Sequence, residues 1–247
     1  MAMDDLAAVL ESLRPAPGSG GMAGVDAQRC ARALGVDGVA VSVTPGSGLN
    51  ELLWVTPGAS TRLEDLQFTL GQGPGPEVAS SGAAVVVPDL AAEPAARWPV
   101  LLPEVLALGI GAVFCLPLRL GEVCLGTMTL QRARPGPLAQ TPMSDARIIT
   151  HALTAALVKD EQSWDAFAAA HDSSHFYRAA VHQATGMVSA QAGVSVAEAL
   201  IRLRAYAFQQ GRSLLEVAED VVARRVHFRD DDGDEPGPAP GGGTEGP

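Results

Sequence analysis

Every strand signal in this sequence lies before Pro142, and only helix signals follow it. Apolar and β-branched residues gather in five short runs separated by turn-forming residues, which is the pattern of β-strands. These runs cover residues 36–44, 51–56, 83–88, 110–118 and 123–131. After Pro142 the apolar residues instead recur at intervals of three and four, as in an amphipathic helix. We therefore expect an α+β unit with helices packed on a sheet, followed by a small all-α unit. A chain of 247 residues that is 47 % hydrophobic suffices for one or two domains with buried cores.

Four helices are expected among these strands, over residues 3–13, 25–34, 61–68 and 100–108. Asp26 stands near the N-cap of the second helix, and Thr61 and Glu64 have the spacing of a capping box at the start of the third. The Gly- and Pro-rich residues 71–76 are expected to end that third helix as a turn. The first two strands are predicted to form a hairpin, and Gly121 offers a positive φ for the turn that joins the last two.

The C-terminal part is predicted to contain one long helix and then three short helices with a common core. The long helix begins at Thr141 and Pro142, and the first short helix covers 175–190 and ends near Gly193. Ser195 and Glu198, and then Ser213 and Glu216, have capping-box spacing and mark the next two helix starts, with Gly211 between these helices. The long helix carries an apolar stripe made by Ile148, Ile149, Ala152, Leu153, Ala156 and Leu157. The last two helices carry the core residues Leu200, Leu203, Ala207, Leu214, Val217, Ala218 and Val221.

Charge is distributed unevenly along the chain. The whole protein has a net charge of −11, which taken alone argues against a nucleic-acid partner. Residues 173–229, however, hold seven arginines against four acidic residues, an excess of three positive charges. Residues 230–247 hold six acidic residues and no basic one, with abundant Gly and Pro, so we expect a disordered tail. A locally basic helical segment therefore lies within an acidic chain.

The helical segment carries residues that resemble the ANTAR domain over about 55 positions. The first helix has His182-Gln-Ala-Thr-Gly-Met-Val, in which Ala184 and Gly186 fit the family's Ala-x-Gly element. Ser195, Ala199 and Leu203-Arg-x-x-Ala207 follow on the second helix, and Val217-Ala218 on the third, in the family's order and at plausible spacing. Residues 20 to 160 resemble the GAF domain that commonly precedes ANTAR in bacterial regulators, in element order and in the segment Leu70-Gly-Gln-Gly-Pro-Gly75.

The resemblance implies RNA binding, because ANTAR domains recognise paired hairpins in nascent transcripts, typically as dimers, so that a terminator cannot form. Arginine, aromatic and amide side chains suit unstacked hairpin-loop bases and phosphates. The candidate RNA-binding residues are Arg178, Gln183, Gly186, Arg202, Arg204, Tyr206, Gln209 and Arg212. Arg204 lies in the family motif itself. Two alternatives stay open, since Gly186 can instead permit tight helix packing, and Tyr206 with Phe208 can instead close the small core.

Three other functions were considered from the residues, and each has a feature of the sequence against it. Cys115 and Cys124 lie on adjacent predicted strands, so a GAF-fold thiol enzyme similar to methionine-sulfoxide reductases is conceivable, but both thiols sit in apolar runs without a basic neighbour. The last two helices could form a DNA-binding helix-turn-helix, although Leu-Leu-Glu at the start of the second suits burial better than base edges. His171 and His175 have i, i+4 spacing without a third ligand, so no metal and no cofactor is expected.

The expected organisation is an N-terminal helix and linker over 1–19, a GAF-like sensor over 20–160, a helical connector over 161–172, an ANTAR-like domain over 173–229 and an acidic tail over 230–247. No apolar run is long enough to cross a bilayer, and Asp4 and Asp5 do not suit a signal peptide, which predicts a cytoplasmic protein without a membrane partner. The expected partners are RNA, a second copy of the chain and a small-molecule ligand of the sensor. No motif identifies that ligand.

Overall fold

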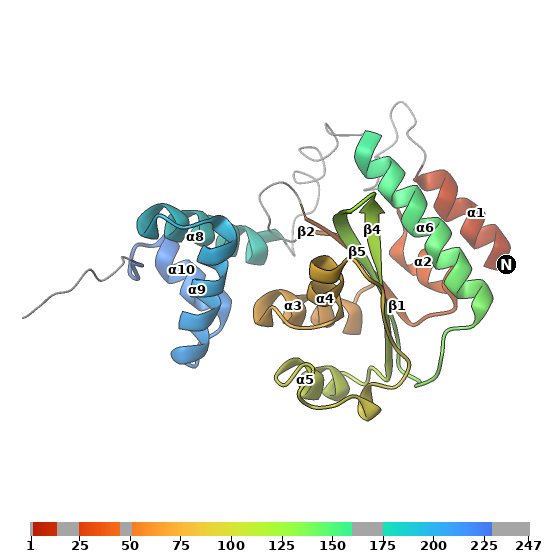
Figure 1. The fold of residues 1–247 in the computed structure, drawn as a ribbon, viewed down its shortest axis with the longest axis horizontal. Coiled ribbons are helices and arrows are strands. Elements are labelled where there is room, and N and C mark those ends of the chain that lie inside the picture. Colours follow the sequence, from red (N-terminus) through yellow and green to blue (C-terminus); the bar gives the residue numbers. More distant parts are fainter. Residues whose placement is uncertain (1, 14–24, 45–50, 160–174, 229–247) are drawn as a thin grey trace, which may run out of the picture.

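The computed structural model describes residues 2–13, 25–44, 51–159 and 175–228 (Figure 1). Its N-terminal part is built on one sheet with the strand order β2-β1-β5-β4-β3, in which every neighbouring pair is antiparallel. The strands are β1 (Gly38–Val43), β2 (Glu51–Val55), β3 (Val85–Val87), β4 (Ala112–Leu120) and β5 (Val123–Arg132). The predicted hairpin of the first two strands and the turn at Gly121, whose φ is 60°, are both confirmed.

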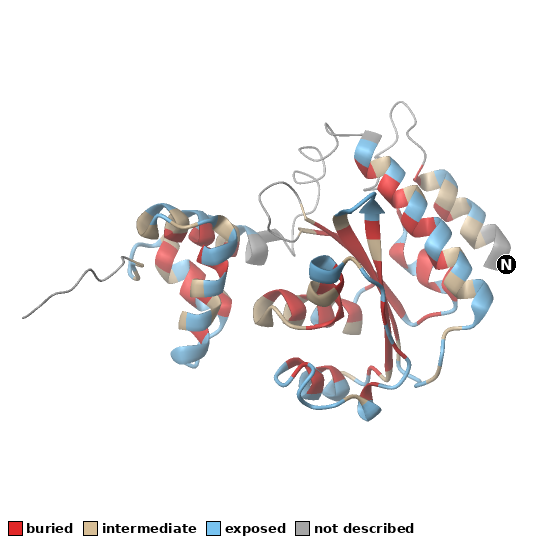
Figure 2. Cartoon of the chain, in the orientation of Figure 1, coloured by how far each residue is buried: buried red, intermediate tan, exposed pale blue. Residues whose placement is uncertain are grey.

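Helices cover both faces of this sheet. One face packs against α1 (Ala2–Ser12), α2 (Ala27–Leu34) and α6 (Gln140–Lys159), and the other lies toward α3 (Ala59–Leu70), α4 (Pro74–Ser81) and α5 (Leu101–Ala107). Side chains alternate along a strand, so Phe114 and Leu116 of β4 join the core with α1, α2 and α6. Val113 and Cys115 of the same strand join the core on the other side. The buried positions follow the sheet and the helix surfaces turned toward it (Figure 2).

Two details of the region around α3 differ from the sequence-based expectation. The helix starts at Ala59, after Gly58 with a φ of 93°, so Thr61 is not its N-cap. The predicted capping box at Thr61 and Glu64 is therefore wrong. The Glu64 carboxylate is instead buried and accepts a hydrogen bond from the Ser42 hydroxyl of β1 at 3.0 Å, because it faces the sheet rather than the helix start.

The Gly- and Pro-rich segment after α3 was predicted to be a turn only. Gly71 does end α3 in the left-handed conformation with a φ of 64°, but Pro74 then opens the helix α4. Proline at the first helical position loses no useful hydrogen bond, and its fixed φ suits a helix start. The backbone N–H of Gly75 donates to the Gln67 side chain at 2.6 Å, which joins the two helices.

The C-terminal part is a bundle of α8 (His175–Ala192), α9 (Val196–Gln209) and α10 (Leu214–Val222). All seven core residues predicted on the last two helices are buried in one cluster that includes Val181, Ala184 and Val188 of α8. The capping box at Ser213 and Glu216 is complete. At the start of α9, Ser195 accepts from the Glu198 backbone N–H at 3.2 Å, while the Glu198 carboxylate pairs with Arg202. The predicted fold class, an α+β domain followed by a three-helix domain, is confirmed.

Membrane-span length was tested over the described residues. No single helix among them is both long and apolar enough to cross a bilayer. The helix segments Ala179–Ala192 and Val196–Gln209 reach that length and apolar character only when they are taken together, and the chain bends by 104° between them. Both helices bury apolar residues in the shared three-helix core, which accounts for their apolar composition.

Candidate RNA-binding site

Helix α8 presents Gln183 and Gly186 to solvent, one turn apart. A Cβ added at Gly186 would meet no heavy atom within 4 Å, so packing within the chain does not require a glycine there. Glycine in a helix interior costs about 0.5–1 kcal/mol relative to alanine. The tight-packing explanation for Gly186 is thus unsupported within the described chain. Arg178 belongs to α8, but its side chain lies outside the described residues.

Two of the candidate arginines form ion pairs within the helical domain. Arg202 contacts Glu198 one turn earlier at 2.9 Å, and Arg212 contacts Asp220 at 2.7 Å. Arg225 contacts the same Asp220 carboxylate at 2.6 Å. The hydrogen bond from Arg212, and after it the one from Arg225, lower the pKa of Asp220 below its usual range. Exposed pairs of this kind are weak, typically below about 1 kcal/mol, so a phosphate can replace the carboxylate. The cationic groups are held in place at the surface.

The two aromatic residues of α9 have different roles. Tyr206 packs edge to face against Phe228, with 5.2 Å between ring centroids, and contacts the three-helix core. Phe208 is 79 % exposed, so the expectation that it closes the core is wrong. Gln209 beside it is also exposed. Phe208 lies five residues beyond the buried Leu203, which is about 140° of rotation around the helix. The helical period alone therefore predicts that Phe208 points away from the core. An exposed ring beside an amide suits stacking on an unpaired base.

Arg204, the candidate in the family motif, contacts the sensor domain. Its guanidinium donates to the carbonyl of Phe68 at the end of α3 and lies over the Phe68 ring, 5.7 Å from the centroid. Phe68 is buried and packs into the core of the helical domain rather than into either sensor core. His182 of α8 lies against the same ring, with a centroid distance of 5.9 Å, and its Nδ1 is 2.8 Å from a carboxylate oxygen of Glu51 on β2. The sensor therefore covers one candidate RNA contact.

A cavity of about 190 Å³ lies at this junction. The sensor supplies eight of its lining residues, and α9 supplies the other two, Leu200 and Arg204. The sensor residues are Thr44, Glu64, Gln67, Phe68, Gly71, Gly75, Pro76 and Ala79. The buried Gln67 amide donates to Glu64 at 2.9 Å, so polar groups of α3 lie beside a residue of the candidate RNA-binding site. A molecule in this cavity would contact both domains.

The two thiols of the thiol-enzyme alternative lie at different positions along their paired strands. Cys124 is paired in register with Arg119, which lies four residues, or roughly 13 Å of backbone, along β4 from Cys115. Burial raises the pKa of Cys115 well above its usual range, and burial, with a smaller effect of Asp26, raises the pKa of Cys30 to about 12. Protonated thiols are poor nucleophiles. Strand register and the raised pKa values therefore give no support to the thiol-enzyme alternative.

The described part of the chain gives no support to a DNA-recognition helix or a metal site. Leu214 begins α10 and is 1 % exposed, so the start of that helix is not presented as a DNA recognition helix would be. The described residues contain no cluster of three potential metal ligands. The His171 and His175 pair lies outside the residues whose side chains are described.

The fold comprises two units, a sheet-based domain and a three-helix domain that follows it. The chain belongs to the GAF domain family, whose sequence profile matches residues 27–157, more than half of its length. It also carries an ANTAR domain at residues 177–222. Both domains predicted from the sequence are confirmed. A GAF domain is a sensor and an ANTAR domain is an RNA-binding antitermination domain, and this architecture is that of a regulator rather than of a catalyst.

Solved structures resemble the sensor part. The GAF domain of a phosphoenolpyruvate-protein phosphotransferase (ptsP) from Coxiella burnetii is 15 % identical, with a TM-score of 0.50, and the match covers 64 % of this chain and 94 % of that one. The GAF domain of an Acinetobacter phosphoenolpyruvate-protein phosphotransferase is 10 % identical, with a TM-score of 0.47, and the match covers 64 % of this chain and 93 % of that one. At this identity the likeness concerns the fold alone. No curated protein sequence matches the chain.

Proposed function

We propose that this protein is a signal-responsive RNA-binding regulator that acts by transcription antitermination in the cytoplasm. The ANTAR domain binds hairpins in nascent transcripts, and the GAF domain controls that binding. The observation that carries the proposal is the exposed pair Gln183 and Gly186, where a helix-destabilising glycine has no role in packing within the chain. A helix surface without a Cβ lets a nucleic-acid backbone approach closely.

The surrounding side chains supply complementary chemistry. Hairpin loops expose unpaired bases, while an A-form stem offers mainly phosphates and shape. Phe208 and Gln209 offer a stacking plane and an amide, and Arg202 and Arg212 offer positive charge. Arg178 is proposed to add a further charge from α8. Tyr206 contributes by holding the core against Phe228 rather than by direct contact.

The substitution Gly186→Ala tests the carrying observation. We expect it to stabilise the helical domain by about 0.5–1 kcal/mol, because alanine is the better helix former and nothing lies within 4 Å of the new Cβ. At the same time it should weaken binding to a two-hairpin RNA by about tenfold, since the methyl group keeps the RNA from the helix surface. Thermal melts and gel shifts on the same samples measure both effects.

Ala190→Ser, at another exposed position of α8, is the matched control and should leave RNA affinity unchanged. The gel shifts should include duplex DNA and an unrelated single-stranded RNA as competitors. Equal binding of all three nucleic acids by the parent protein, or a Gly186→Ala protein that binds the two-hairpin RNA like the parent, would remove the proposed site.

A homodimer is part of the proposal, with α6 and α8 as the contact. Ile149, Leu153 and Leu157 of α6 are buried in the sensor core, but Ile148 is 49 % and Val158 47 % exposed. These two apolar side chains have no cover within the described chain, and exposed apolar patches often mark association surfaces. We expect multi-angle light scattering to give twice the chain mass at tens of micromolar, and Ile148→Glu to give the monomer mass. A monomer for the parent protein, with and without RNA, would contradict this.

The junction between the domains provides a means of control. The Arg204 guanidinium is bound to the Phe68 carbonyl and lies over the Phe68 ring, so fewer of its donors can reach RNA phosphates and the state described here is proposed to be the weak-binding one. A small molecule that occupies the junction cavity would compete with this contact and favour a state in which Arg204 is exposed. A ligand shifts such an equilibrium only by its difference in affinity for the two states.

A further inference from the structure

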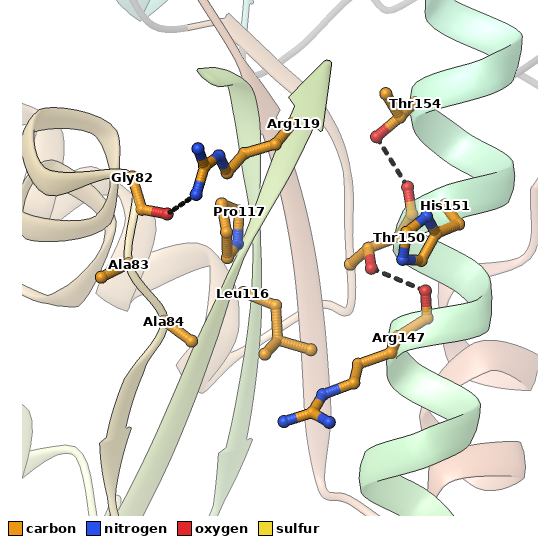
Figure 3. Close-up of a pocket in the computed structure, with 10 residues that line it drawn as sticks. All are labelled: Gly82, Ala83, Ala84, Leu116, Pro117, Arg119, Arg147, Thr150, His151 and Thr154. Carbon is orange, nitrogen blue, oxygen red and sulfur yellow. Dashed lines mark hydrogen bonds between the residues drawn. The ribbon is translucent and has the colours of Figure 1, made fainter. Parts of the chain in front are cut away.

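A second cleft lies in the sensor at the edge of the sheet, away from the helical domain. Strand β3 pairs with Val113–Cys115 of β4, so among the described residues the rest of β4 has no strand neighbour on that side. Helix α6 packs against the same part of β4. The short edge strand thereby leaves a cleft of about 470 Å³. Its walls are Gly82, Ala83, Ala84, Leu116, Pro117, Arg119, Arg147, Thr150, His151 and Thr154 (Figure 3).

The ionisable side chains lining this cleft are Arg119, Arg147 and His151, and no aspartate or glutamate is among the lining residues. Such a composition is unexpected in a chain with a net charge of −11. Arg147 and His151 are one turn apart on α6, and Arg119 comes from β4. In Figure 3 the Arg147 side chain reaches from α6 toward β4. Basic groups from two elements thus face one space.

The arginines differ in how they are held. Arg119 donates to the backbone carbonyls of Gly82 and Gly121, each at 3.1 Å, which fixes its guanidinium at the rim. The carboxylate near it, on Glu122, is 3.5 Å away, and its side chain is fully exposed to water, so it neutralises little of the charge. Arg147 has no hydrogen bond or ion pair from its guanidinium to the residues described here, and it is therefore available to a ligand.

The rest of the wall includes an apolar part, formed by Ala83, Ala84, Leu116 and Pro117. Thr150 and Thr154 also line the cleft, and their hydroxyls donate to backbone carbonyls of α6. Binding sites for small molecules commonly have volumes of roughly 300–1,000 Å³, apolar walls and a few polar groups that fix orientation. We propose that this cleft binds a small organic anion, with its carboxylate or phosphate on Arg147 and His151 and its carbon skeleton against the alanines and Leu116. The site is separate from the junction cavity and does not depend on RNA binding. It lies on α6, the last described helix before the ANTAR domain.

Isothermal titration calorimetry of the full chain tests the proposal with three probes: citrate for the carboxylate, glycerol 3-phosphate for the phosphate, and glycerol as the neutral control. We expect saturable binding of at least one anion and none of glycerol. Arg147→Gln should weaken that binding by about tenfold, as loss of one charge-assisted contact does. Arg134→Gln removes the same charge from an exposed position outside the cleft and should change it less than twofold.

The substitution Ala84→Phe distinguishes anion binding in the cleft from anion attraction by the general surface charge. Ala84 is exposed, so the larger side chain fits without disturbing a core, but it fills the cleft while every charge is kept. We expect it to abolish anion binding and to leave the melting temperature within about 2 °C of the parent. Failure of both anions to saturate below about 10 mM, equal effects of Arg147→Gln and Arg134→Gln, or undiminished binding by Ala84→Phe would overturn the proposal.

Discussion

Replacement of Leu203 by alanine is expected to unfold the ANTAR domain and with it to abolish RNA binding. Leu203 is fully buried in the centre of the three-helix core, with Ala199, Leu200 and Val217 in the same cluster. Truncation of a buried leucine costs about 2–5 kcal/mol. A three-helix unit of this size has little stability to lose. Circular dichroism at 222 nm should show that the variant has lost helical signal before heating, and that the remaining signal melts with the sensor.

Ile201→Ala is the matched control, because it removes an aliphatic side chain of the same size that is 62 % exposed on the same helix. Its effect on the free energy of unfolding should stay below about 0.5 kcal/mol. Arg204→Ala should likewise leave the domain folded while weakening RNA binding and lowering its salt dependence by about one ion. A Leu203→Ala protein with the parent melting curve would contradict the assigned core, and an Arg204→Ala protein that binds like the parent at every salt concentration would remove Arg204 from the site.

Phe68→Ala is expected to raise RNA affinity by about tenfold. The Phe68 ring packs into the helical core and belongs to neither core of the sensor, so its loss weakens the contact between the domains rather than the sensor fold. The ring also lies under the Arg204 guanidinium and beside His182. Without the ring these contacts are lost, and the state in which Arg204 faces solvent becomes more populated. Filter binding over a range of salt concentrations measures the gain.

The double variant Phe68→Ala with Arg204→Ala identifies the source of that gain. If Arg204 carries it, the double variant should bind no more tightly than Arg204→Ala alone. Leu70→Ala on the same helix is the control, because Leu70 packs against the sensor core and should leave RNA affinity unchanged. An increase in affinity that survives removal of Arg204, or no increase with Phe68→Ala, would contradict the proposed control by the sensor.

Local sequence patterns predicted most of the fold. Periodicity located the five strands and the three-helix core, and glycines with positive φ at 121 and 211 ended elements where expected. Helix α4 was missed because its first residues, Pro74, Gly75 and Pro76, have the composition of a turn. The capping-box spacing at Thr61 and Glu64 was misleading because the carboxylate is used for a contact with β1.

The site was predicted less well than the fold, because its decisive contacts join residues far apart in the sequence. Arg204 bonds to Phe68 across 136 positions, and no local pattern encodes that approach. The cleft of Arg119 and Arg147 likewise depends on the short length of β3, which leaves the edge of β4 open. Phe208 is different, because the helical period predicts its exposure although it was expected to close the small core.

The position of α1 determines when the sensor can finish folding during translation. Val9 and Leu13 lie in the same core as Ile149 and Leu153 of α6, so this core cannot be completed until α6 has been synthesised. Contacts between such distant segments fold slowly. Until α6 has been synthesised, the nascent chain exposes the part of one apolar sheet face that α6 covers, and exposed apolar surface favours chaperone binding and aggregation. The three ANTAR helices, whose contacts are local, follow directly and can fold quickly once synthesised, so the sensor core is complete before the RNA-binding surface exists.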